Sequence, residues 1–142
     1  MPTLRDLIQR LDIVSASPEQ SVRDVAELMN RERVGAIPVV SDDSLVGIFT
    51  ERDLLTRIVV ADRDPVATSV AEVMTHEVIT ANLDDGVEQT LGLMQRSGCR
   101  HLPVVHDGRA IAILTMRDLL RNEVDERTEE LESLRAYLHA NN

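Results

Sequence analysis

The sequence predicts an α+β fold made of two copies of one β-α-β-β-α unit, followed by a helical extension. The first observation is internal repetition: shifted by 65 positions, residues 17–55 align with residues 82–120 without a gap, and 14 of these 39 pairs are identical. The second is that each copy contains two apolar runs around a short polar turn, which is typical of a β-hairpin. The third is that apolar residues at helical spacing precede each hairpin. Together they indicate a duplicated unit.

Each unit is expected to begin with a short strand, at residues 12–16 in the first copy and 77–81 in the second. A helix follows, and in the first copy Ser21 and Asp24 form a capping-box pattern at its start. The second copy has the poorer pair Gly86 and Gln89 there. The helix faces expected to be buried carry Val22, Val25, Ala26 and Met29 in the first copy, and Val87, Leu91 and Met94 in the second.

The hairpins are predicted in "AIPVV-SDDS-LVGIF" and "HLPVV-HDGR-AIAIL", and a final helix in each copy begins at Thr50 or Thr115. The chain divides into a first repeat at 1–62, a connector at 63–70, a second repeat at 71–122 and a helical extension at 123–142. After Gly108 there is no Gly or Pro, so the last helix can continue to about residue 139. A single unit of about 55–60 residues buries too little surface to be stable alone, so we expect the two copies to pack together.

Composition excludes several classes of protein. The chain has one Phe, one Tyr and no Trp, and therefore lacks aromatic platforms for stacking single-stranded nucleic acid. A net charge of −10 argues against binding to nucleic acid or to an anionic membrane. One cysteine cannot form an internal disulfide or a multi-cysteine zinc site. Without a signal peptide or an apolar run of spanning length, we expect a soluble, cytoplasmic protein with no metal site.

Two segments carry a family resemblance, "GAIPVV...LVGIFTERDLL" at 35–55 and "RHLPVV...AIAILTMRDLL" at 100–120. They resemble the tandem CBS-domain pair, or Bateman module, in the pattern Gly-apolar-apolar-Pro followed by Gly-Ile-apolar-Thr/Ser-x-x-Asp. The segment "VAEVMTHEVITA" at 70–81 also resembles the start of a family unit, and the resemblance extends from about Leu4 to Arg121. It implies a pseudo-two-fold pair with two clefts between the CBS repeats. It further implies a stand-alone regulatory module, not an enzyme, whose clefts bind adenosine-containing molecules such as AMP, ADP, ATP or S-adenosylmethionine.

The repeated Thr-x-Arg-Asp segment has two interpretations. Thr50 with Asp53, and Thr115 with Asp118, can be capping boxes with a purely structural role. Alternatively, each Asp accepts hydrogen bonds from the hydroxyls of a ribose, while the Thr hydroxyl and the free N–H groups of the helix N-terminus contact the sugar or phosphate. One oxygen can serve both a cap and a ligand, so the two interpretations are compatible.

Basic residues favour a phosphate ligand. A cap needs no cation at the second helical position, yet both copies have one there, Arg52 and Arg117. An arginine fork suits phosphate, although an ion pair with a nearby Asp is an equal alternative. Arg100 and His101 form a second basic pair, where the first copy has Gly35 and Ala36. The two clefts are therefore expected to differ, and one occupied site per chain is a reasonable expectation.

Without an aromatic ring, an adenine would rest on aliphatic walls and on backbone hydrogen bonds. Ala112 stands where the family pattern has Gly, and its methyl group is expected to narrow the second cleft. The full set of predicted nucleotide-binding residues is Ser15, Ala16, Ile37, Thr50, Arg52, Asp53, Thr80, Ala81, Arg100, His101, Leu102, Thr115, Arg117 and Asp118.

The extension carries a narrow apolar stripe at Leu131, Leu134 and Leu138 among acidic residues. We expect it to pack on a second copy or on the protein's own flank, which fits the homodimers implied by the resemblance. The favoured hypothesis is an adenine-nucleotide sensor that alters a regulated protein partner. The alternative is an interaction module with empty clefts that dimerises or holds a partner. No nucleophile–base spacing or cofactor loop supports an enzyme.

Overall fold

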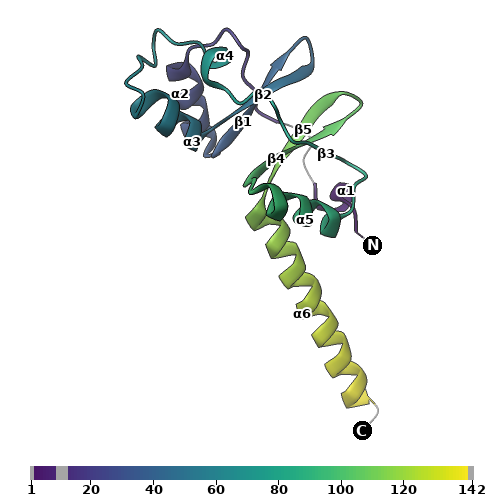
Figure 1. Ribbon diagram of the computed structural model, residues 1–142. Helices are drawn as coiled ribbons and strands as arrows, with labels where there is room; N and C mark the ends of the chain where they lie inside the picture. The colour runs from purple at the N-terminus through teal and green to yellow at the C-terminus, as the bar shows by residue number, and fades with distance from the viewer. Residues whose placement is uncertain (1, 9–12, 141–142) are drawn as a thin grey trace.

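The computed structural model describes residues 2–8 and 13–140, and residue 12, where the first predicted strand begins, lies outside this part. Two hairpin units lie side by side, and a long C-terminal helix extends away from them (Figure 1). The α+β architecture with two repeats is therefore confirmed.

The first repeat contains a helix, a hairpin and a short terminal helix. Helix α2 spans Val22–Glu32, strands β1 and β2 span Ala36–Ser41 and Ser44–Thr50, and α3 (Glu51–Leu54) continues into the π-helical turn η1 (Leu55–Val59). Ser21 caps α2 by accepting a hydrogen bond from the Asp24 N–H at 3.1 Å. At the hairpin turn, Asp42 and Asp43 both have positive φ angles of 51° and 64°, as a tight two-residue turn requires.

The second repeat has the same order of elements, with β3 at Ala81–Asn82, α5 at Val87–Ser97, β4 at His101–His106 and β5 at Arg109–Thr115. The register of each hairpin shifts at the same place, between Val39 and Val40 and between Val104 and Val105. The strands before the helices are shorter than predicted. In the first repeat, Ala16 alone among residues 13–16 bridges Val39, and in the second the pairing begins only at Ala81.

The two cores exchange their short helices. Helix α1 (Leu4–Leu7) packs in the second repeat, where the Leu4 N–H donates to the Asp85 carbonyl at 2.9 Å. Helix α4 (Val70–Val73) packs in the first repeat, where the Val70 N–H donates to the Gln20 carbonyl at 2.8 Å. Both begin with capping boxes that the sequence analysis did not identify. The sequence boundaries at 62 and 71 thus separate the copies along the chain, whereas in space each core includes a helix from outside its own repeat.

Helix α6 spans Met116–Ala140, which confirms the predicted continuation of the last helix. Its 25 residues extend over about 37 Å at 1.5 Å per residue. Only its first turns lie against the body, beside α5 and β5, and the remainder projects away (Figure 1). Within the described residues, no helix combines the length and apolar character needed to cross a membrane.

Candidate functional site

Both Thr-x-Arg-Asp segments form capping boxes. In the first repeat, the Thr50 N–H donates to Asp53 Oδ2 at 3.0 Å, and the Asp53 N–H donates to Thr50 Oγ1 at 3.1 Å. The second repeat reproduces the pair, with the same two distances between Thr115 and Asp118. Both Thr–Asp pairs are therefore helix caps, and a ligand role has to rest on what surrounds each carboxylate.

The first carboxylate is covered by residues 73–75, which follow α4 at the start of the second repeat. Asp53 is only 7% exposed, and Thr75 Oγ1 lies 3.5 Å from each of its two oxygens. Arg57 Nε lies 3.7 Å from Asp53 Oδ1, and the same guanidinium donates to the carbonyls of Val73 and Met74 at 2.8 and 3.0 Å. Asp53 therefore holds residues 73–75 against the first repeat and has no open side for a sugar.

The close approach of this segment explains Gly47. The Ile48 N–H donates to the Thr75 carbonyl at 3.0 Å, and the Thr75 N–H donates back at 2.9 Å. A Cβ on Gly47 would lie 2.5 Å from Met74 Sδ and 3.0 Å from the Thr75 oxygen. Glycine is needed there because residues 74–75 approach closely, and not for a ligand. Ala112, which was expected to narrow the second cleft, does not line the cavity beside Thr115 and lines a different, smaller one.

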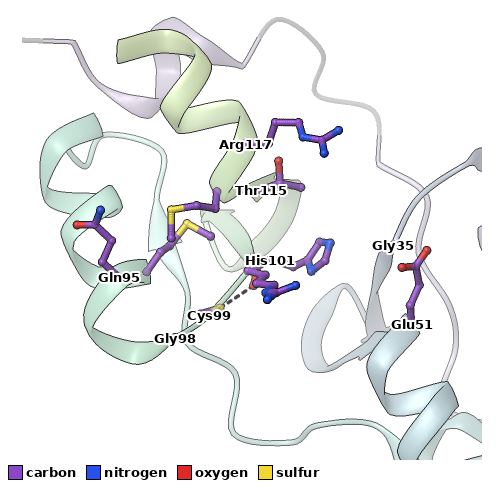
Figure 2. A pocket seen from close by; sticks show the side chains of 11 residues that line it. Gly35, Glu51, Gln95, Gly98, Cys99, His101, Thr115 and Arg117 are labelled. Atoms are coloured by element: carbon purple, nitrogen blue, oxygen red, sulfur yellow. Dashed lines mark hydrogen bonds between the residues drawn. The ribbon is translucent and has the colours of Figure 1, made fainter. Parts of the chain in front are cut away.

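The second motif is open and borders a cavity between the repeats (Figure 2). Asp118 and Arg117 are exposed, and among the described residues Asp118 makes only its cap contacts with Thr115. The cavity has a volume of about 710 Å³. The first repeat contributes two of its lining residues and the second contributes nine: Gly35, Glu51, Met94, Gln95, Gly98, Cys99, Arg100, His101, Thr115, Met116 and Arg117.

His101 reaches across this cavity towards the first repeat, where Figure 2 shows it facing Glu51. A Cβ on Gly35 would lie 3.1 Å from His101 Nε2 and 3.4 Å from Glu51 Cδ, so the missing side chain makes room for the imidazole. Burial lowers the pKa of His101 from its ordinary value of 6.5, and the positive charge of Arg100 adds to this effect. The negative charges of Glu51 and Asp118 oppose it. The net effect favours the neutral imidazole.

Cys99 lies beside His101 in the same wall. Its thiol donates a hydrogen bond to the His101 carbonyl at 2.8 Å, and burial raises its pKa. A thiol with a raised pKa is a poor nucleophile, so Cys99 here supports the backbone of the cavity.

The cavity can hold an anion with an apolar body. Arg100 and Arg117 each offer a planar fork of N–H donors that suits phosphate, and the N-terminus of α6 adds positive potential. Met94 and Met116 provide adaptable apolar surface. Glu51 is the one acidic residue among the lining residues and lies on the opposite repeat.

The family model of the CBS domain matches two segments of this chain, residues 4–60 and 70–125. The chain belongs to the CBS-domain family. Its resemblance to a tandem CBS pair is thereby confirmed, and CBS pairs are regulatory modules.

Three similar proteins illustrate this relationship. The protein MK0525 of Methanopyrus kandleri is 34% identical over 82% of this chain, which spans only 60% of that relative. A solved CBS domain, NE2398, is 33% identical, with a TM-score of 0.82 over 87% of this chain and 99% of the other. The structure of CBSX2 in complex with AMP is 27% identical, with a TM-score of 0.76 over 89% of this chain and 99% of the other.

Several predicted site residues of this CBS pair lie away from the cavity. Ile37 and Leu102 were expected to be cavity walls, but both are 0% exposed and pack inside the two cores. Ala16 and Ala81 are also buried. The N–H of Ala16 donates to the Pro38 carbonyl, and its own carbonyl accepts from Val40, so neither group is available to an adenine. None of these four residues lines the cavity beside Thr115.

Other predicted residues are exposed but lie elsewhere. Ser15, Arg52 and Thr80 are exposed, and none of them lines either of the two cavities described here. Among the predicted residues, the structure brings together Arg100, His101, Thr115 and Arg117, with Asp118 beside them. The predicted difference between the two clefts agrees with this arrangement.

Residues that the sequence analysis missed explain why the clefts differ. Arg57 follows Asp53 by four residues on the same helical face, a spacing that could have been noticed. Thr75 is 22 residues from Asp53, and no sequence pattern links the two. Gly35 was noted only as a departure from the second copy and Glu51 was not singled out, because their role depends on the other repeat.

A smaller cavity of about 320 Å³ lies between the first repeat, including residues 13–14, and β5 of the second repeat. Its lining includes Ile13, Val14, Pro38 and Ala112, is mostly apolar, and contains no residue of either Thr-x-Arg-Asp segment. Within residues 2–8 and 13–140, no three His, Cys, Asp or Glu side chains gather as a metal site would require.

Proposed function

We propose that this CBS pair senses an adenosine-containing nucleotide at a single site per chain, the cavity beside Asp118. One observation carries the proposal. Of the two Thr-x-Arg-Asp segments, only the second combines an exposed carboxylate with a cavity lined by two arginines. The AMP bound to CBSX2, a protein with this fold, supports the class of ligand.

Each side chain has a role in the proposed complex. The Asp118 carboxylate accepts hydrogen bonds from the ribose hydroxyls while remaining the cap of α6. Arg100 and Arg117 bind phosphate oxygens, and the methionines pack against the base. Since each polar contact contributes about 1 kcal/mol net, we expect micromolar affinity, about −8 kcal/mol.

The position of the cavity links ligand binding to regulation. Gly35 and Glu51 come from the first repeat and Thr115 and Arg117 from the second, so a ligand there contacts both. A ligand that prefers one relative arrangement of the repeats shifts the population towards it. A protein partner that senses this arrangement would then respond to the nucleotide.

Thermal melting with a panel of AMP, ADP, ATP, S-adenosylmethionine and GMP tests the proposal. At 100 times its dissociation constant, a ligand adds about 2.7 kcal/mol of stability, which is several degrees for a chain of this size. We expect a shift with at least one adenosine compound and none with GMP.

Asp118→Asn is the sharpest variant for this test. Asparagine keeps the oxygen that accepts from the Thr115 N–H but replaces the other acceptor with a donor, so the fold should survive and the ligand shift should disappear. A flat panel with the unaltered chain would contradict the proposal. It would favour the alternative function, an interaction module in which both Thr–Asp pairs serve only as helix caps.

A further inference from the structure

Helix α6 carries an apolar stripe that faces solvent. All the residues from Arg127 to Ala140 are exposed, and Leu131, Leu134 and Leu138 are 54%, 54% and 53% exposed. Residues spaced by three and four positions lie on one face of a helix, so these leucines form a continuous stripe. The stripe lies on the part of α6 that projects beyond the body (Figure 1).

A projecting helix of this kind needs a partner. The exposed stretch at residues 127–140 is only about four helical turns long. An isolated helix of that length is marginal in water, because most helical stability in proteins comes from packing of an apolar face. The sequence of this stretch is nevertheless free of Gly and Pro and rich in helix formers. This combination is typical of a helix that packs against another helix.

The charged residues beside the stripe indicate which helix packs against it. If Leu131 and Leu138 occupy heptad position a and Leu134 position d, Glu130 falls at position g and Arg135 at the following e. In a parallel pair of identical helices, position g of one helix faces the following e of the other. Glu130 of each copy then faces Arg135 of the other, giving two symmetric opposite-charge pairs. An antiparallel pair instead sets g against g and e against e, so these two residues would not meet.

We propose that the C-terminal helices of two copies of this chain pair in parallel through Leu131, Leu134 and Leu138, with Glu130 opposite Arg135. Arg127 occupies the preceding d position and ends the uninterrupted apolar seam there. The pairing is therefore short and dissociates on dilution. It brings the two CBS pairs together by their C-terminal ends, independently of any ligand in the cavity.

Disulfide trapping in the full-length chain tests the pairing directly. In a Cys99→Ser background, Leu134→Cys places one thiol at the seam, and Ala136→Cys places one on the outer face as a matched control. We expect the chain with Leu134→Cys to form a covalent dimer on mild oxidation in several-fold higher yield than the chain with Ala136→Cys. Equal yields, or none at position 134, would overturn the proposal. They would point to a helix that binds a different protein or the protein's own flank.

Charge exchange then tests the orientation. Sedimentation of the full chain should show that Glu130→Arg or Arg135→Glu alone weakens dimerisation by about two- to fivefold. The double variant should recover the original dissociation constant. A double variant as weak as the single ones would overturn the parallel arrangement. Melting curves of each variant show that its body remains folded.

Discussion

The two Thr-x-Arg-Asp segments form the same helix cap, but different residues surround the Asp carboxylate in the two repeats. At Asp53, the segment after α4 supplies Thr75 and the turn after α3 supplies Arg57, and together they bury the carboxylate. At Asp118, the carboxylate stays exposed beside a cavity of about 710 Å³. One duplicated motif therefore fastens a chain segment in the first repeat and is available to a ligand in the second.

The difference shows that the Asp of this motif can accept a hydrogen bond from a second partner while it caps its helix. In either setting, the Asp caps its helix with one oxygen and keeps acceptor capacity for a second partner. In the first repeat that partner is the protein's own Thr75 hydroxyl. In the second, we propose that it is a ribose.

The largest expected difference between the two motifs is in stability. Asp53→Ala removes a buried cap together with the carboxylate that Arg57 and Thr75 contact, so we expect a loss of about 2–3 kcal/mol of unfolding free energy. Asp118→Ala removes only an exposed cap and should cost about 1 kcal/mol. Urea unfolding of the two variants measures both values. Equal losses would show that Asp53 does not hold residues 73–75 against the first repeat.

The next effect concerns the close contact between Gly47 and residues 74–75. Gly47→Ala pushes a methyl group against Met74, which is buried, and against the Thr75 backbone. Overpacking of this kind should cost about 1–3 kcal/mol. The matched exchange Ala112→Gly meets no such contact and should change stability by about 1 kcal/mol or less. If calorimetry finds Gly47→Ala neutral, the close approach of residues 74–75 is not maintained in solution.

A smaller effect is the dependence of stability on pH, to which His101 of the second repeat should contribute. Because burial lowers the pKa of His101 below 6.5, the unfolded chain takes up a proton that the folded chain resists. The stabilising contribution of neutral His101 is therefore fully present above that value and is lost as the pH falls below it.

His101→Gln should flatten the dependence of unfolding free energy on pH between neutral and mildly acidic conditions. Ala36→Gln is the matched change at the corresponding position of the first repeat and should leave the slope unaltered. Unfolding curves at several pH values measure both slopes. An unchanged slope in the chain with His101→Gln would mean that His101 titrates in the folded protein as it does in water.

The smallest expected effect is on ligand affinity. Glu51 lines the cavity from the first repeat and the two arginines line it from the second, whereas the second copy has Met116 at the position that corresponds to Glu51. Removing one negative charge with Glu51→Gln should tighten binding of an anionic nucleotide by about two- to threefold, since a surface charge several ångströms away contributes only a fraction of a kcal/mol in water. Titration of AMP into both chains checks this. Weaker binding instead would indicate that Glu51 accepts a hydrogen bond from the ligand.

The sequence was sufficient for whatever depends on local pattern or on repetition. Both hairpins, the buried faces of α2 and α5 and the long final helix follow from apolar spacing and turn residues. The expected asymmetry of the clefts came from Arg100 and His101, which have no basic counterparts in the first copy.

What the sequence did not reveal depends on contacts between distant segments. The exchange of α1 and α4 between the cores, and the closing of Asp53 by Thr75, are tertiary arrangements without a local signature. Ile37 and Leu102 were assigned to a cavity because apolar residues in a hairpin can face either a core or a cleft. Only packing decides which, and here both face a core.

Isothermal titration of AMP into the full-length chain tests the central claim most directly, because it counts sites. A single site per chain is the predicted result, with binding abolished by Asp118→Asn. Two equivalent sites per chain, or binding that survives Asp118→Asn, would contradict the assignment of one closed and one open motif.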